Sequence, residues 1–163
     1  MPRVYVSVGS NLEREINIRG AIAALRARFG AVDLSPVYES KAEGFDGEDF
    51  YNLVAAFDTQ ESIEQLHRGL AEIEKAHGRS RSDARFGPRT LDIDILLYGD
   101  AIYREGRFDI PRREILRWPF VLGPLAQLAP QARHPETGER FVDLWQRFRG
   151  SAALREVALN LGD

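Results

Sequence analysis

The order of strand-like and helical segments over the first hundred residues constrains the fold of this chain more than any other feature. Apolar residues recur at three- and four-residue steps, the spacing of amphipathic helices, at residues 12–29 and 62–77. Strand-like runs lie around and between these helices, at residues 4–8, 32–40, 50–59 and 91–98. This β-α-β-β-α-β order is that of the split βαβ, ferredoxin-like motif, and it predicts an α+β fold with helices on an antiparallel sheet.

The remaining segments are shorter. Pro36 interrupts the run at residues 32–40, and because proline has no backbone N–H, we expect this strand at a sheet edge or with a bulge. Beyond the last long strand, the sequence predicts a pair of short strands and then two short helices, at residues 101–103, 107–110, 120–128 and 141–148.

Size and composition are those of one soluble domain. The 163 residues fit a single domain, residues 1–163, and the net charge of -3 argues against a general nucleic-acid binder. No apolar run approaches the roughly 20 residues of a membrane span, and the lack of cysteine excludes disulfides and thiolate sites. The dispersed histidines, His67, His77 and His134, are expected at the surface. We expect a cytoplasmic monomer that acts on small molecules, with no nucleic-acid or membrane partner.

Residues 91–98 form the strongest strand in the chain, and two aspartates interrupt its apolar character. Because side chains alternate between the faces of a strand, one face consists of Leu91, Ile93, Ile95 and Leu97. Asp92 and Asp94 then project from the other face, ~6.6 Å apart by the strand rise. Such a carboxylate pair suits two Mg²⁺ ions in a phosphoryl-transfer site. Neutralisation of both aspartates by arginines on a solvated sheet face is the alternative.

Residues 78–90, just before this strand, are basic in an otherwise acidic protein. They contain four arginines and one aspartate, a local charge of +3. Guanidinium groups match phosphate oxygens in geometry and in charge, so cations beside a carboxylate pair suit a metal–polyphosphate complex. A segment of this length without periodicity is expected to be a functional loop. The alternative is a solvated loop that pairs only with Asp92 and Asp94.

Residues 50–52 combine aromatic rings with an amide. Phe50 and Asn52 share one strand face, so a ring and a donor–acceptor group are presented together. This combination suits a flat heterocycle, which can stack and form paired hydrogen bonds. Phe86 and Phe120 offer further ring faces, although each phenylalanine taken alone also fits a core position.

Together these motifs resemble the 6-hydroxymethyl-7,8-dihydropterin pyrophosphokinases of folate biosynthesis. The most specific part is FGPRTLDIDI at residues 86–95. Further matching segments, in order over nearly the whole chain, are residues 9–11, 50–52, 74, 78–79, 120–125 and 129–130. The resemblance implies a ferredoxin-like βαββαβ core elaborated into a three-layer α/β/α sandwich. It also implies transfer of the pyrophosphoryl group of ATP to the hydroxymethyl oxygen of the pterin, with release of AMP.

The resemblance implies roles for individual residues as well. Asp92 and Asp94 are expected to hold two Mg²⁺ ions and to form the catalytic set together with Arg79 and Arg89. The expected ATP-binding residues are Glu74, Arg79, Arg81, Arg89, Ile95, Arg107, Arg112 and Arg113. The expected pterin-binding residues are Ser40, Gly44, Phe50, Asn52, Phe86, Asp92 and Phe120.

The chain departs from the family pattern at three places. After Pro111, where the family commonly has a histidine near the ATP phosphates, this chain has Arg112. The family's downstream arginine is displaced to Arg117, and residues 40–44 replace a Thr-x-Pro-like stretch. A divergent paralogue that binds ATP or a pterin with altered acceptor specificity or little turnover is therefore an alternative. A nucleic-acid binder that uses the arginine segment is a third hypothesis, which the acidic overall charge disfavours.

Overall fold

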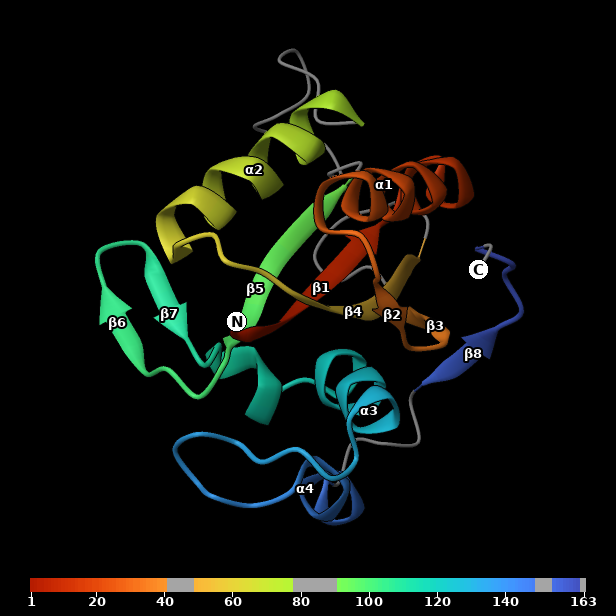
Figure 1. Cartoon of the computed structure of the whole chain (residues 1–163). Coiled ribbons are helices and arrows are strands. Elements are labelled where there is room, and N and C mark those ends of the chain that lie inside the picture. The colour runs from red at the N-terminus through yellow and green to blue at the C-terminus, as the bar shows by residue number, and fades with distance from the viewer. Residues whose placement is uncertain (41–48, 78–90, 149–153, 162–163) are drawn as a thin grey trace.

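The computed structural model describes residues 1–40, 49–77, 91–148 and 154–161 (Figure 1). Its strands are β1 (Arg3–Ser10), β2 (Asp33–Leu34), β3 (Val37–Ser40), β4 (Phe50–Asp58), β5 (Asp92–Tyr98), β6 (Tyr103–Glu105), β7 (Phe108–Ile110) and β8 (Arg155–Val157). Its helices are α1 (Arg14–Phe29), α2 (Ile63–Ala76), α3 (Pro119–Leu128), α4 (Phe141–Arg147) and a short 3₁₀ helix, η1 (Arg113–Leu116). No helix within these ranges is both long and apolar enough to cross a bilayer.

The main sheet has the strand order β5-β1-β4-β3-β8, with β2 also paired to β4, and every pairing is antiparallel. The first strand of the chain thus lies between β4 and β5, the two strands on either side of α2, which is the arrangement of the split βαβ motif. The predicted α+β, ferredoxin-like core is confirmed. The short β6–β7 hairpin forms a separate two-stranded sheet beside it (Figure 1).

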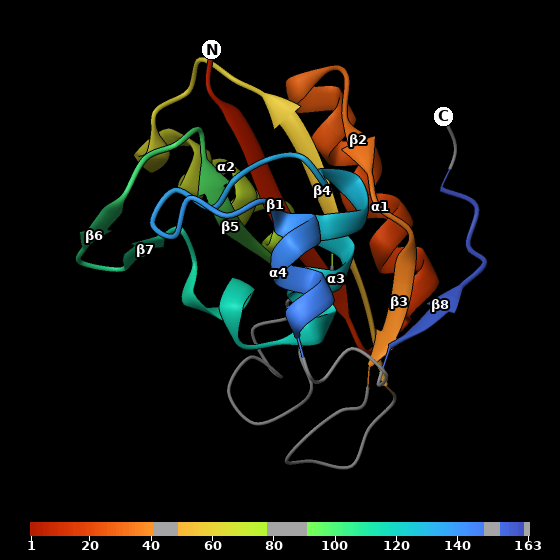
Figure 2. The same ribbon diagram turned by 90° about the horizontal axis from the view of Figure 1, so that it is seen from below.

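Helices cover both faces of the sheet, which makes three layers. Figure 1 shows α1 and α2 on one side of the sheet and α3 on the other, and the view from below in Figure 2 shows α4 packed outside α3. Two separate apolar clusters fill the two interfaces. One joins the sheet to α1 and α2, and the other joins it to α3, α4 and η1.

The position of α2 follows from its amphipathic sequence and its cap. Its buried residues, Ile63, Leu66, Leu70 and Ile73, repeat at helical spacing and face the sheet. At its start, the Ser62 hydroxyl accepts from the backbone N–H of Gln65, and the Gln65 side chain accepts from the backbone N–H of Ser62. This reciprocal capping box satisfies two otherwise unpaired donors and fixes where the helix begins.

Strand β5 bears out the predicted alternation up to Ile95 and then departs from it. Leu91, Ile93 and Ile95 belong to the cluster under α1 and α2, as expected. Leu97, which was expected on the same face, belongs instead to the cluster under α3. The reason is a register irregularity: Val6 pairs with Ile95 and Tyr5 with Leu97, which leaves Leu96 as an extra residue on β5. Such a bulge reverses the face of every later side chain.

The segment predicted as one strand at residues 32–40 consists of two, β2 and β3, with Ser35 and Pro36 between them. Ser35 bridges this break, because its N–H donates to the carbonyl of Val54 and its hydroxyl accepts from the N–H of Val54. Strand β8, which pairs with β3, was not predicted from the sequence. This contact is reinforced by the carboxylate of Glu39, which accepts from Arg14 and from Arg155 at 2.8 Å each.

His134 is buried, contrary to the expectation that all three histidines lie at the surface. It is 2% exposed, its ring packs edge-on against Phe141, and its Nδ1 accepts hydrogen bonds from the backbone N–H groups of Glu136 and Thr137. Burial lowers the pKa of the imidazole, as does the charge of Arg104, while the nearby carboxylates of Glu136 and Glu139 act in the opposite direction. A protonated Nδ1 cannot accept these two bonds, so the fold requires neutral His134.

We therefore expect His134 to make the fold sensitive to mild acid. Because its pKa is lower in the folded than in the unfolded chain, its contribution to stability is present above the ordinary histidine pKa of about 6.5 and is lost as the pH falls below it. Urea unfolding between pH 7.5 and 5 should show a steeper loss of stability for the wild type than for His134→Gln. Parallel pH dependences of the two proteins would contradict this.

Candidate active site

Two rows of residues cross the face of the sheet that lies toward α3. In the first row, Gly9 on β1 pairs with Asn52 on β4 and with Asp92 on β5. In the next row, Ser7 pairs with Val54 and with Asp94. Since Ile93 and Ile95 point into the opposite cluster, Asp92 and Asp94 share this face, as the sequence predicted.

Gly9 lies between Asn52 and Asp92 in this row, and its lack of a side chain makes room for the Asn52 amide. A methyl group built on Gly9 would lie 3.1 Å from Oδ1 of Asn52 and 3.9 Å from the ring of Phe50, so both side chains lean over this glycine. The Nδ2 of Asn52 donates to the Ser40 hydroxyl at 2.7 Å, which fixes the direction of the amide. Ser40, Phe50 and Asn52, three of the predicted pterin-binding residues, are thus neighbours at one end of the first row.

Glu74 ties α2 to the strand that carries both aspartates. Its Oε2 accepts a hydrogen bond of 2.7 Å from the backbone N–H of Ile93, the residue between Asp92 and Asp94. Strand β5 is the last strand on its side of the described sheet, so N–H groups on its outer edge need partners other than a strand. Because Ile93 lies between Asp92 and Asp94, this hydrogen bond holds the Glu74 side chain next to both aspartates, which supports a structural role for Glu74.

A pocket of about 200 Å³ opens between α2, β5 and the β6–β7 hairpin. Six of the predicted site residues line it: Glu74, Asp92, Asp94, Ile95, Arg107 and Arg112. Sequence reasoning did not predict the other lining residues, among them His67, Phe108 and Asp109. The rings of His67 and Phe108 meet edge-to-face with centroids 5.4 Å apart, so this end of the pocket is largely aromatic. The i, i+3, i+4 spacing of His67, Leu70 and Ala71 was the available sequence signal for one wall.

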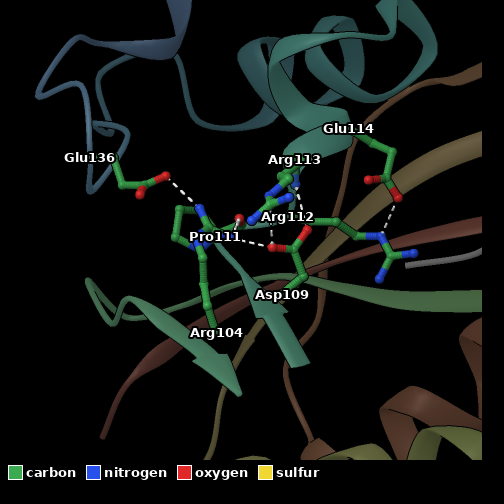
Figure 3. Close-up of polar contacts among 7 residues, drawn as sticks. All are labelled: Arg104, Asp109, Pro111, Arg112, Arg113, Glu114 and Glu136. Carbon is green, nitrogen blue, oxygen red and sulfur yellow. Dashed lines mark hydrogen bonds and ion pairs between the residues drawn. The ribbon is translucent and has the colours of Figure 1, made fainter. Parts of the chain in front are cut away.

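Two adjacent arginines in the segment after β7 differ in their contacts with the acidic side of this pocket. The Nη2 of Arg112 lies 3.8 Å from Oδ1 of Asp94, and its Nε donates to Glu114 at 2.6 Å. Arg113 turns the other way: its backbone N–H and its guanidinium both meet the carboxylate of Asp109, which also pairs with Arg104 (Figure 3). Only one of these two adjacent arginines therefore faces the aspartates.

The acidic pair is compatible with magnesium. Mg²⁺ prefers oxygen ligands and is usually held by one or two carboxylates, with phosphate oxygens and waters completing the octahedron. Asp92 and Asp94 supply two carboxylates on one face, and the Asp94 side chain is 43% exposed. Among the residues that the structure describes, no group of three or more histidine, aspartate or glutamate side chains forms an all-protein metal cage. The donor set fits an ion that arrives with a phosphate ligand.

The remaining predicted site residues fall into two groups. Arg113 is not among the pocket-lining residues, and Phe120, in the first turn of α3, packs beside Trp118 with ring centroids 4.9 Å apart. Five predicted residues lie outside the described part of the chain: Gly44, Arg79, Arg81, Phe86 and Arg89. The roles of all these residues stay predictions.

With this geometry in place, comparison with known proteins gives a consistent result. The family model of 7,8-dihydro-6-hydroxymethylpterin-pyrophosphokinase matches residues 5–130. The chain belongs to this family. The 2-amino-4-hydroxy-6-hydroxymethyldihydropteridine pyrophosphokinase of Pseudomonas aeruginosa is 43% identical over 138 residues, covering 82% of this chain and 85% of that protein. The enzyme of the same name from Aquifex aeolicus is 35% identical over 137 residues, covering 83% and 85%.

Solved structures agree on the fold. The crystal structure of wild-type Plasmodium falciparum HPPK-DHPS superposes with a TM-score of 0.69 over 90% of this chain at 13% sequence identity. This chain corresponds to 44% of that longer one. At such low identity the likeness concerns architecture alone, and it supports the family's ferredoxin-like fold independently of the sequence match.

Within this pyrophosphokinase fold, Glu74 should be tested first for stability. Glu74→Ala leaves the N–H of Ile93 without its acceptor and should lower the free energy of unfolding by about 1–3 kcal/mol. Glu74→Gln keeps an oxygen acceptor and should cost less. Glu72→Ala, on the exposed side of the same helix, is the control for helix propensity. Equal losses for Glu74→Ala and Glu72→Ala in urea unfolding would contradict the structural role.

Proposed function

We propose that this chain transfers the pyrophosphoryl group of ATP to the hydroxymethyl group of 6-hydroxymethyl-7,8-dihydropterin, releasing AMP, as a step of folate biosynthesis. Membership of the pyrophosphokinase family supports this reaction. The structural observation that carries it is the single row in which Asn52, Gly9 without a side chain, and Asp92 follow one another across three strands. No observation favours the divergent paralogue with little turnover.

The pocket between α2 and the β6–β7 hairpin is suited to the nucleotide. Its aromatic and apolar end, formed by His67, Leu70 and Phe108, can take a purine ring, which prefers to leave water and pack against other rings. Arg107 and Arg112 line the same pocket nearer the aspartates. A triphosphate that extends from the aromatic end toward β5 would meet these cations, which offset its negative charge.

Asp92 and Asp94 are the residues that would hold magnesium. The bound ion supplies charge neutralisation of the transferred group and orientation of its oxygens. We propose two ions, because a pair of carboxylates on one strand face would suit a two-metal site of the kind that serves phosphoryl transfer. The predicted arginines Arg79 and Arg89 would add further positive charge around the transferred phosphates.

The acceptor would lie over Gly9. Neighbouring strands are about 4.8 Å apart, so Asn52 and Asp92, two strands apart, are separated by roughly 10 Å along the row. A flat bicyclic ring over Gly9 could therefore receive hydrogen bonds from Asn52 at one end while its alcohol approaches Asp92 at the other. Phe50 offers a ring edge beside this position, and Phe120 is the proposed cover from the α3 side.

Catalysis in this arrangement rests on positioning and charge rather than on a nucleophilic side chain. A primary alcohol attacks phosphorus efficiently only when it is held in line and when the growing charge is neutralised. The row across β4, β1 and β5 supplies the first condition, and the cations around β5 supply the second. We further propose that residues 1–163 form one cytoplasmic, monomeric domain whose partners are the two small-molecule substrates and not nucleic acid or a membrane.

Loss of the second aspartate tests the proposed chemistry. Asp94→Ala should lower kcat for AMP formation by about 10²–10³-fold, because a charge-stabilising group is lost. Asp94 is partly exposed, so thermal unfolding should change little. Asp100→Ala, in the exposed turn after β5, is the matched control and should keep full activity. An Asp94→Ala protein with more than roughly a tenth of wild-type activity would contradict the proposal.

Loss of the amide tests the acceptor position. Asn52→Ala should weaken pterin binding by about tenfold or more, since one end of the ring loses its hydrogen-bonding partner. Binding of ATP should change by much less, because Asn52 is not among the residues that line the pocket beside α2. Calorimetry with each ligand measures both effects. A larger loss for ATP than for the pterin would place the acceptor elsewhere.

A further inference from the structure

Arg112 is held both at its backbone and at its guanidinium. Its backbone N–H donates to the carbonyl of Leu96 at 2.9 Å, which anchors the residue to β5 two positions beyond Asp94. Its guanidinium then lies between two carboxylates, with Nη2 3.8 Å from Asp94 and Nε 2.6 Å from Glu114 on η1. The contact with Glu114 is short and charge-assisted, while the contact with Asp94 is long. Figure 3 shows the Arg112 side chain extended toward Glu114.

This placement puts a fixed positive charge beside a carboxylate proposed to bind a divalent cation. Mg²⁺ coordinates carboxylate oxygens directly, at about 2.0–2.1 Å, so an ion held by Asp94 would lie against the same carboxylate that Arg112 contacts. A guanidinium 3.8 Å from the same carboxylate would oppose such an ion, since like charges at this separation repel. Without a nucleotide, Arg112 and the ion therefore compete for Asp94.

A triphosphate changes this balance. Its oxygens attract both the divalent cation and the guanidinium, so Arg112 can exchange the long contact with Asp94 for a phosphate oxygen. Glu114 binds only Nε, which leaves the two terminal nitrogens of the guanidinium free to make that exchange while the side chain stays in place. The pocket lining supports this, because Arg112 borders the same pocket as Asp94 and Arg107.

We propose that Arg112, positioned by Glu114, couples cation binding to nucleotide binding: it weakens the affinity of the carboxylate pair for a divalent cation until a nucleotide polyphosphate arrives. This inference rests on the proposed function of the same site. Arg112 contacts the substrate, whereas Glu114 is a positioning residue that acts through it. Because coupling between two ligands is reciprocal, the cation must also strengthen nucleotide binding by the same factor.

The adjacent residue supplies a matched control. Arg113 carries the same charge one position later, but its guanidinium is 60% exposed and pairs with Asp109 at 3.3 Å, away from Asp94. Removing Arg113 changes the net charge of the protein as much as removing Arg112 does. A difference in Mn²⁺ affinity between Arg112→Gln and Arg113→Gln therefore depends on where the lost charge lay and not on the net charge of the protein.

The test measures binding rather than turnover. Mn²⁺ replaces Mg²⁺, and electron paramagnetic resonance follows free Mn²⁺ during titration of the nucleotide-free protein. Arg112→Gln should bind Mn²⁺ about 5-fold or more tightly than the wild type, while Arg113→Gln should match the wild type. Glu114→Gln should bind Mn²⁺ more weakly, because the released guanidinium is free to settle on Asp94.

A second titration measures the coupling from the nucleotide side. The probe is the α,β-methylene analogue of ATP, whose transferable bond is blocked, with saturating Mn²⁺ or with chelator. The strengthening of analogue binding by Mn²⁺ should shrink in Arg112→Gln and persist in Arg113→Gln. Arg112→Gln that binds Mn²⁺ no more tightly than the wild type, including no detectable binding by either, would overturn the coupling.

Asp94→Asn distinguishes a failure of the proposed metal site from a failure of the coupling alone. If Asp94→Asn binds Mn²⁺ with the analogue as well as the wild type does, the proposed metal site itself fails. If Asp94→Asn loses Mn²⁺ and Arg112→Gln is unchanged, only the coupling fails.

Discussion

The alternation of side chains along β5 determines where the chemistry of this protein can take place. Ile93 and Ile95 are almost fully buried under α1 and α2, and burying each contributes about 1.5–3 kcal/mol. A slip of one residue would expose both isoleucines and press Asp92 and Asp94 into an apolar cluster, where an unpaired carboxylate is far more costly. The core therefore fixes the acids on the face toward α3. The bond from Ile93 to Glu74 holds the same register from the outer edge of the sheet.

The parts of the fold that depend on local pattern could be predicted from sequence. The long strands, both long helices, their order along the chain and the shared face of the two aspartates follow from periods of 2 and 3.6 residues. The bulge at Leu96, which reverses Leu97, could not be predicted, because β1 and β5 impose it jointly across some ninety residues of sequence. Strand β8 was missed for a related reason. Its three residues have no apolar alternation, and Glu39 on β3 pairs with Arg155 only after folding.

The candidate site likewise has parts that could be predicted from the sequence and parts that could not. The shared face of Asp92 and Asp94, and that of Phe50 and Asn52, could be predicted from the alternation of side chains along each strand. The aromatic end of the pocket was not found, because His67 and Phe108 lie on different elements and meet only when the β6–β7 hairpin packs against α2. His134 was misjudged, since its backbone partners at residues 136 and 137 reach it only through the turn that they form with it.

Gly9 explains why three strands are needed to build one site. Each strand contributes one residue to the row, and only the middle residue lacks a side chain. An alanine at this position would crowd the Asn52 amide at 3.1 Å, and a larger residue would fill the space between the amide and Asp92. The glycine thus separates Asn52 from Asp92 by two strand spacings. The register of β1 sets this distance, so in the proposed site the positions of the acceptor and of the cations would depend on the same backbone pairing that holds the sheet together.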